Sequence, residues 1–225
     1  MSREGRHAEL QEKTQQLLQG PLKHVRAAAL AAVLVPLATV AASRVVAQGN
    51  PSGGICPPGQ VCRPSVPEPC DFVTSGGFVL TDSLNMANFG AHGGCKNGQF
   101  WGHVNYVDHG GFAGRVPYHI DSVQITGYLT PVQGSNIRDI CGLARTNAAE
   151  PQPVMFRVRL VDNGEPGIAD LFGIRLSNTY HLTPRPLNNG QGGGGNAQLH
   201  EPNPSTTAPF PAPDEFTMCG GLEAP

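Results

Sequence analysis

The sequence predicts an all-β protein, an antiparallel β-sandwich or barrel of about eight strands, with an N-terminal signal helix and Pro/Gly-rich ends. Three observations lead to this prediction. Short stretches of alternating apolar and polar residues recur at roughly even spacing, as in half-buried strands. Gly and Pro number 29 and 21 among 225 residues, which indicates frequent turns. No segment after residue 47 keeps a helical period.

The clearest strand is 154–161, where apolar residues from Val154 to Leu160 alternate along one face. Segment 171–176 repeats this pattern after an Asp-Asn-Gly-Glu-Pro-Gly turn. Because Asn-Gly and Pro-Gly favour tight reversals, these two strands are predicted to be antiparallel neighbours. In chain order, the predicted strands are 77–80, 84–89, 100–107, 119–129, 137–144, 154–161, 171–176 and 196–200.

The first 47 residues have the pattern of an export signal. Lys23 and Arg26 precede an uncharged apolar run over 27–42, and Ala47 supplies a small residue where a signal peptidase would cut. The run is shorter than the roughly 20 residues that span a bilayer, and an uncleaved signal anchor is the alternative. The predicted organisation is a signal peptide or signal anchor over 1–47, a Pro/Cys-rich linker over 48–70, a β-domain over 71–200 and a Pro-rich tail over 201–225.

Charge is divided along the chain. Six basic and three acidic residues lie among the first 47, which leaves nine basic and fourteen acidic residues in the remainder. The remainder therefore lacks the clustered Lys and Arg of a nucleic-acid-binding surface, and we expect no nucleic-acid partner. We expect contact with a membrane only if the N-terminal segment is retained.

All six cysteines follow residue 47, and an even number in an exported chain favours disulfide bonds. A Cys95–Cys141 bridge would close a long loop and stabilise the fold by about 4 kcal/mol. No pair has the tight spacing of a zinc motif. We therefore predict disulfides and a secreted or cell-surface location. The candidate cysteines are Cys56, Cys62, Cys70, Cys95, Cys141 and Cys219.

One turn carries a candidate calcium site. Asp162, Asn163, Glu165 and Asp170 lie within nine positions of a Gly-rich turn, and hard oxygen ligands on such a turn suit Ca²⁺. The alternative is turn chemistry, in which Asp and Asn side chains bond their own backbone. Calcium is the one cofactor that the sequence suggests, and a chelator would then lower the melting temperature.

Histidines and serines suggest two weaker alternatives. Imidazoles are common ligands of transition metals, although solvated surface histidines also explain the set His92, His103, His109, His119 and His200, with Asp108.

A hydrolase would need a nucleophile and a base. Candidates for that grouping are Ser122, Ser135, His119 and Asp121, but no Gly-x-Ser-x-Gly elbow is present. No catalytic residue is therefore assigned.

Aromatic residues suggest a binding surface. Phe100, Trp101, Tyr106, Phe112 and Tyr118 are close in sequence. Trp101 and Tyr106 are five residues apart and therefore point to opposite faces of a regular strand, so at least one belongs to the core. An outward ring would offer a stacking platform for a carbohydrate or a protein.

Five segments carry a family resemblance: 87–90, 102–109, 161–167 with Asp170, 172–174 and 194–200. Together they resemble an uncharacterised family of small secreted bacterial β-domains, which occur alone or attached to cell-surface proteins. The resemblance covers roughly residues 70–200, and the loop 183–193 and the extra cysteines depart from it. It implies a β fold and export and supplies no catalytic residues.

We therefore expect an exported, extracytoplasmic β-domain with a structural or binding role and a protein or carbohydrate ligand. A secreted hydrolase or metal-dependent enzyme is the first alternative. A membrane-anchored cell-surface protein is the second.

Overall fold

A computed structural model describes residues 63–149, 151, 153–188 and 192–225. Within them, nine strands form one antiparallel sheet in the order β8-β7-β6-β5-β4-β3-β2-β1-β9. The predicted signal segment lies outside the described residues. The elements are β1 Phe72–Leu80, β2 Met86–Lys96, β3 Gln99–Asp108, β4 Tyr118–Leu129, β5 Ile137–Thr146, β6 Val154–Val161, β7 Leu171–Leu176, β8 His181–Pro186, β9 Gly194–His200 and the helix α2 Glu215–Cys219.

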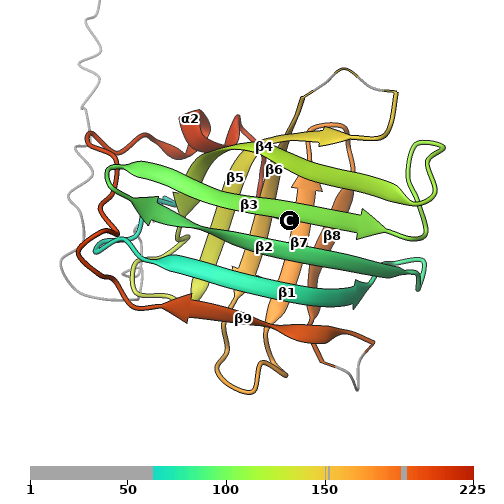
Figure 1. Ribbon diagram of the computed structural model, residues 1–225, viewed down its shortest axis with the longest axis horizontal. Coiled ribbons are helices and arrows are strands. Elements are labelled where there is room, and N and C mark those ends of the chain that lie inside the picture. The colour runs from blue at the N-terminus through green and yellow to red at the C-terminus, as the bar shows by residue number, and fades with distance from the viewer. Residues whose placement is uncertain (1–62, 150, 152, 189–191) are drawn as a thin grey trace, which may run out of the picture. The chain divides into compact units, whose positions relative to one another are not determined.

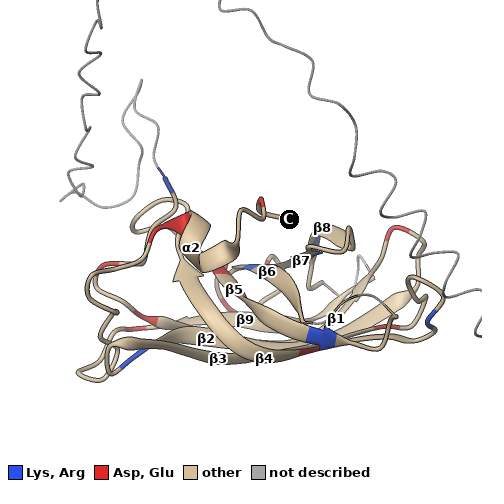
Figure 2. Ribbon diagram, turned by 90° about the horizontal axis from the view of Figure 1, so that it is seen from above, with Lys and Arg blue, Asp and Glu red and all other residues tan. Residues whose placement is uncertain are grey.

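The sheet curls into a nearly closed barrel. Strands β1, β2, β3 and β9 run across the front of the molecule, and β5 to β8 cross behind them (Figure 1). The view from above shows these two sets as separate layers (Figure 2). Strands that follow one another in sequence pair with one another as far as β8, whereas β9 returns to pair with β1. The predicted all-β barrel or sandwich is confirmed.

Two elements were not predicted. Strand β8 contains Pro184 and Pro186 and lies at an edge of the sheet, where a residue without an N–H is tolerated. Helix α2 lies in the Pro-rich tail; the side chain of Asp214 accepts a hydrogen bond from the Thr217 N–H, and Gly220 ends the helix in the left-handed conformation. Such caps let a short helix form in an otherwise extended segment. Among the described residues, no helix has the length and apolar character needed to cross a membrane.

The predicted pairing of 154–161 with 171–176 is confirmed, because Val161 lies opposite Leu171. Strands β2 and β3 are joined by the shorter turn Asn97-Gly98, in which both residues have positive φ. This is the signature of a two-residue hairpin. It sets the register at Lys96 opposite Gln99.

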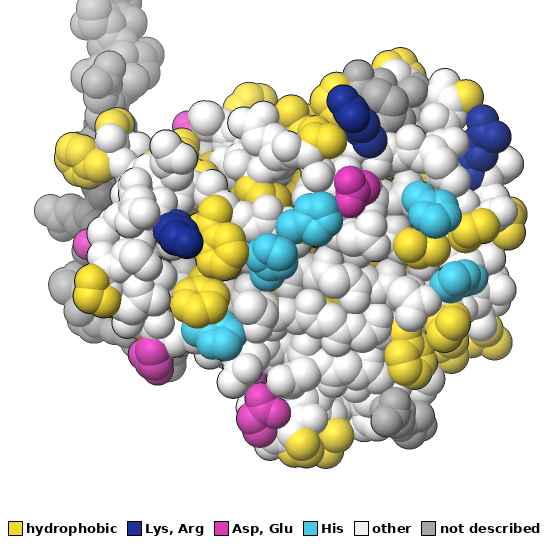
Figure 3. Space-filling view, viewed as in Figure 1, with side chains coloured by type: hydrophobic (Ala, Val, Ile, Leu, Met, Phe, Trp, Pro, Cys, Tyr) yellow, Lys and Arg dark blue, Asp and Glu magenta, His cyan; other side chains and the backbone are white. Residues whose placement is uncertain are grey.

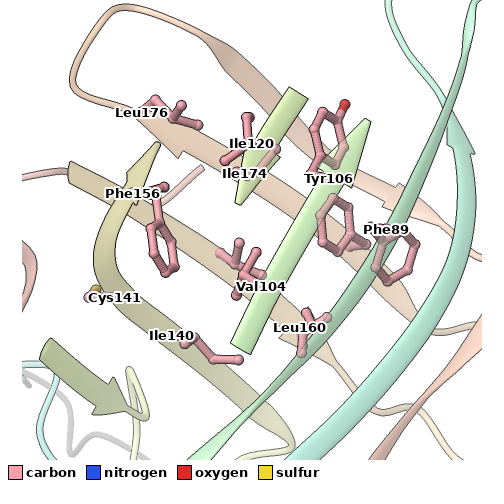
Figure 4. Close-up of a cluster of buried hydrophobic side chains, with 14 of the residues drawn as sticks. Phe89, Val104, Tyr106, Ile120, Ile140, Cys141, Phe156, Leu160, Ile174 and Leu176 are labelled. Carbon is pink, nitrogen blue, oxygen red and sulfur yellow. The ribbon is translucent and has the colours of Figure 1, made fainter. Parts of the chain in front are cut away.

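Side chains fill the interior of the barrel. Figure 4 shows apolar side chains from β2 to β7 packed against one another. Each fully buried large side chain contributes about 1.5–3 kcal/mol relative to an exposed one. Tyr106 is fully buried, whereas Trp101 is only partly buried on the outer face, which confirms that these two rings lie on opposite faces.

Two buried polar networks lie within this core. The Tyr180 hydroxyl donates to Asp108 at 2.7 Å and contacts the Tyr106 hydroxyl at 2.7 Å. Burial raises the pKa of both tyrosines, so both stay protonated and hold the network together. In the second network, Arg138 and the Tyr128 hydroxyl donate to the Asp71 carboxylate. Because each buried group has a partner, these networks fix the packing of the strands that carry them.

Two disulfides connect the described residues, Cys70–Cys95 and Cys141–Cys219. The suggested Cys95–Cys141 bridge is therefore wrong, because each of these two cysteines has another partner. Cys141–Cys219 ties the tail that bears α2 to strand β5. The two remaining candidates, Cys56 and Cys62, lie outside the described residues. Disulfides are typical of an oxidising compartment.

Candidate functional site

The residues predicted to bind calcium lie in the loop between β6 and β7, which forms hydrogen bonds with β9. Asp170 is fully buried. One oxygen of its carboxylate accepts the Asn163 N–H at 2.8 Å and the other accepts the Ala197 N–H of β9 at 2.8 Å. Asp162 accepts the Leu199 N–H of the same strand at 2.7 Å. We call Asp162 and Asp170 the edge clamp, because they satisfy donors on the free side of β9.

The other two predicted ligands, Asn163 and Glu165, also form hydrogen bonds within the protein. The Asn163 side chain donates to the Ala169 carbonyl at 2.5 Å, and Glu165 accepts the Asn196 amide at 3.0 Å. Within the described part of the chain, no three His, Cys, Asp or Glu side chains are grouped to hold a metal. The calcium site stays a prediction, whereas the hydrogen bonds show what these side chains do in the fold.

A second feature is the outer face of β9, β1, β2 and β3. The registers place Asn196 beside Gly76, Gly76 beside Gly90, and Gly90 beside Asn105, in one row across four strands. Residues two positions away add Thr74 and Gln198 to the same face. We call these six residues the polar shelf. Figure 3 shows this face as a broad uncharged area, with histidine and hydrophobic side chains along its border.

The fold does not require either glycine of the polar shelf. A Cβ on Gly90 would meet nothing within 4 Å, and one on Gly76 would meet only the Phe89 carbonyl oxygen at 3.7 Å. Neither residue has positive φ. Gly94 differs, because its Cβ would lie 2.4 Å from that of Phe72. Glycine inside a strand weakens it and often marks a place where a ligand approaches the backbone closely.

Aromatic rings border the polar shelf. The rings of Phe72 and His200 stack with centroids 4.3 Å apart, and Trp101 lies 6.0 Å from Phe72 on the other side. The small Gly94 between β1 and β3 leaves room for this contact. The stacked rings therefore form a ridge beside the shelf rather than a flat platform.

Of the candidate histidines, the structure brings two together. His92 and His103 are cross-strand partners with ring centroids 6.2 Å apart. His109 instead contacts the Asn88 side chain at 2.7 Å, and His200 contacts Thr74 at 2.8 Å. Asp108 belongs to the buried tyrosine network. The predicted convergence is thus limited to one pair.

The candidate hydrolase residues are only partly assembled. Ser122 Oγ lies 3.1 Å from His103 Nδ1, and Asp121 lies 3.2 Å from His103 Nε2. Ser122 Oγ also accepts the Val104 N–H at 2.9 Å, so it is tied to the strand backbone instead of projecting from a sharp turn. Ser135 contacts Thr130 in a separate loop. This arrangement orients the His103 ring, and we assign it no nucleophilic role.

The environment of the histidines predicts a pH dependence. Burial, followed by the nearby His103, lowers the pKa of His92, and burial with Arg175 lowers that of His181. Because both folded-state pKa values lie below the unfolded value of about 6.5, the unfolded chain binds more protons as the pH falls. We therefore expect the melting temperature to fall from about pH 7 to about pH 5. The double variant His92→Gln with His181→Gln should show a shallower fall, and an unchanged slope would contradict this assignment.

A surface hollow at one end of the barrel has a volume of about 400 Å³. The buried or half-buried carboxylates that line it already have partners, since Asp71 pairs with Arg138 and Asp162 belongs to the edge clamp, whereas Glu68 and Glu201 are exposed. We therefore place the candidate functional site on the polar shelf and its histidine border.

Comparison of the chain with protein-family models, curated proteins and solved structures finds no match. The geometry of the site therefore carries the functional argument alone.

Sequence reasoning missed the two shelf glycines. The sequence did contain a signal for Gly90, because the Asn97-Gly98 turn fixes which residues of β2 and β3 face one another. That register places Gly90 beside Asn105 and His92 beside His103. The contribution of β9 to the shelf had no comparable local signal.

Proposed function

We propose that this protein is an exported binding domain that holds a neutral, extended carbohydrate chain across the polar shelf. The observation that carries the proposal is the pair of neighbouring glycines, Gly76 and Gly90, which the fold does not require. Glycine weakens a strand, and its presence at both positions is explained if a ligand lies against the exposed backbone. The disulfides support a location outside the cytoplasm.

The chemistry of the shelf favours a carbohydrate over a protein. Amide side chains both donate and accept hydrogen bonds, as sugar hydroxyls require, and Asn105 and Gln198 are exposed. No charged residue belongs to the shelf, which suits a neutral ligand. Protein interfaces usually centre on buried aromatic or Arg residues, whereas here the aromatic ridge lies at the border.

The test is binding of the full chain, purified under oxidising conditions, to insoluble cellulose, chitin and β-glucan and to soluble neutral polysaccharides in affinity gels. We expect retention by at least one neutral polymer. Gly90→Thr should weaken that retention by about tenfold, since its side chain lifts the ligand off the sheet. The same variant should keep or raise the melting temperature, because a β-branched residue fits a strand better than glycine.

Thr183→Ile is the matched control, because it adds bulk to an exposed position on β8 at the other edge of the sheet. It should leave retention unchanged. Failure of the unmodified chain to bind any of these polymers, or full binding by Gly90→Thr, would refute the proposal.

A further inference from the structure

The imidazoles of His92 and His103 lie beside one another on the outer face of the barrel. They belong to β2 and β3, in a hairpin whose tight turn fixes their register. Their ring centroids are 6.2 Å apart and the rings are inclined at 42°. Two imidazoles that share one ion with bonds of about 2.0–2.1 Å place their ring centres about 5–6 Å apart, so a small side-chain rotation is sufficient.

The His103 ring is already oriented. Its Nδ1 lies 3.1 Å from Ser122 Oγ, which is itself fixed by the Val104 N–H. Metal-binding histidines commonly have the second ring nitrogen held in this way, which leaves the first nitrogen directed at the ion. The other ring nitrogen of His103, Nε2, lies 3.2 Å from Asp121. A bound ion would replace this contact, and the carboxylate would stay nearby to balance its positive charge.

His92 is free to coordinate. Its ring is half-buried beside Trp101, with centroids 5.5 Å apart. Within the described part of the chain it forms no hydrogen bond, so neither ring nitrogen has to exchange a protein partner for the ion. The contact with Trp101 restricts the ring and lowers the entropy lost on binding.

We infer that His92 and His103 form a binding site for a divalent late transition metal, Zn²⁺ or Cu²⁺, with Asp121 beside it. Two imidazoles suit these ions, whereas Ca²⁺ and Mg²⁺ prefer oxygen ligands. Fewer than three strong protein ligands gather here, so the ion keeps water or exogenous ligands. The site is therefore exchangeable and open to solvent, unlike a structural zinc site with four protein ligands. This inference does not depend on carbohydrate binding.

The test uses the full chain without an affinity tag, treated with a chelator, with any free thiol alkylated, and then titrated calorimetrically with Zn²⁺ and Cu²⁺. We expect one ion per chain. His92→Gln and His103→Gln should each weaken binding by about tenfold or more, and Ser122→Ala should weaken it less. Mg²⁺ should give no heat of binding.

His119→Gln is the matched control, because His119 is an exposed histidine on neighbouring β4. It should bind as tightly as the unmodified chain. His92, His103 and His119 are on the outer face, so the melting temperatures of their variants without metal should stay close to that of the unmodified chain. Absence of binding, or binding that survives both His92→Gln and His103→Gln, would overturn the inference.

Discussion

Replacing Asp139 by alanine should lower the free energy of unfolding by about 3–5 kcal/mol. Asp139 is fully buried, and its two oxygens accept hydrogen bonds from Arg157 and Arg159. Arg157 is only 1% exposed. Without the carboxylate its guanidinium keeps a single charged partner, Glu215, whose side chain is 36% exposed. Removing one partner of a buried ion pair is among the largest single costs that a substitution can impose.

Removing the Asp139 carboxylate should also loosen the C-terminal tail. Arg157 donates to Glu215 of α2 at 2.7 Å and to the Leu222 carbonyl at 2.8 Å, so the same guanidinium holds both β5 and the tail. Urea denaturation measures the stability, and limited proteolysis reports tail release. Glu223→Ala is the control, since its pair with Arg175 is largely exposed and should contribute less than about 1 kcal/mol. A loss below about 1 kcal/mol in Asp139→Ala would show that the network is unimportant.

Asp170→Asn should cost about 3 kcal/mol although it changes almost no volume. Both carboxylate oxygens of Asp170 accept backbone N–H groups, from Asn163 and from Ala197 of β9. An amide can accept from only one of them, and its NH₂ group then faces the second donor. One buried N–H is therefore left without a partner, and a bond to a charged group is lost.

Hydrogen exchange provides the more specific measurement. The Ala197 amide should exchange faster in Asp170→Asn, whereas amides of the β6–β7 pair should change only with global stability. Asp162→Asn should have a smaller effect, because Asp162 is only half-buried. Adding a chelator to the unmodified chain tests whether a bound Ca²⁺ stabilises this loop in addition to the hydrogen bonds of the edge clamp. A melting temperature that falls with chelator would show that a bound ion contributes to the role of this loop.

Local sequence patterns predicted most strands because alternation is a short-range property. Segments 119–129, 137–144, 154–161 and 171–176 lie within the observed β4 to β7. The short run 77–80 predicted only the end of β1, since Gly76 and Gly77 hide the preceding alternation. Strand β8 was missed because its prolines contradict strand propensity, which an edge position overrides.

The candidate site was harder to predict because it depends on long-range register. The six residues of the polar shelf come from four strands, and β9 joins them only through its pairing with β1. The sequence identified Asp162 and Asp170 by their carboxylate oxygens, which were predicted to bind a cation. In the structure these oxygens accept N–H groups of a distant strand. A carboxylate beside a turn has the same local sequence whether it receives a cation or closes a sheet.

The seam between the first and last strands also constrains how the chain folds. Thr74 and His200, which contact one another across β1 and β9, are 126 residues apart in sequence. A fold that depends on such distant pairs has high contact order and forms slowly. Until β9 arrives, β1 lacks its outer neighbour and exposes an edge that could pair with another chain. The arrival of β9 therefore decides when this edge of β1 is protected from pairing with another chain.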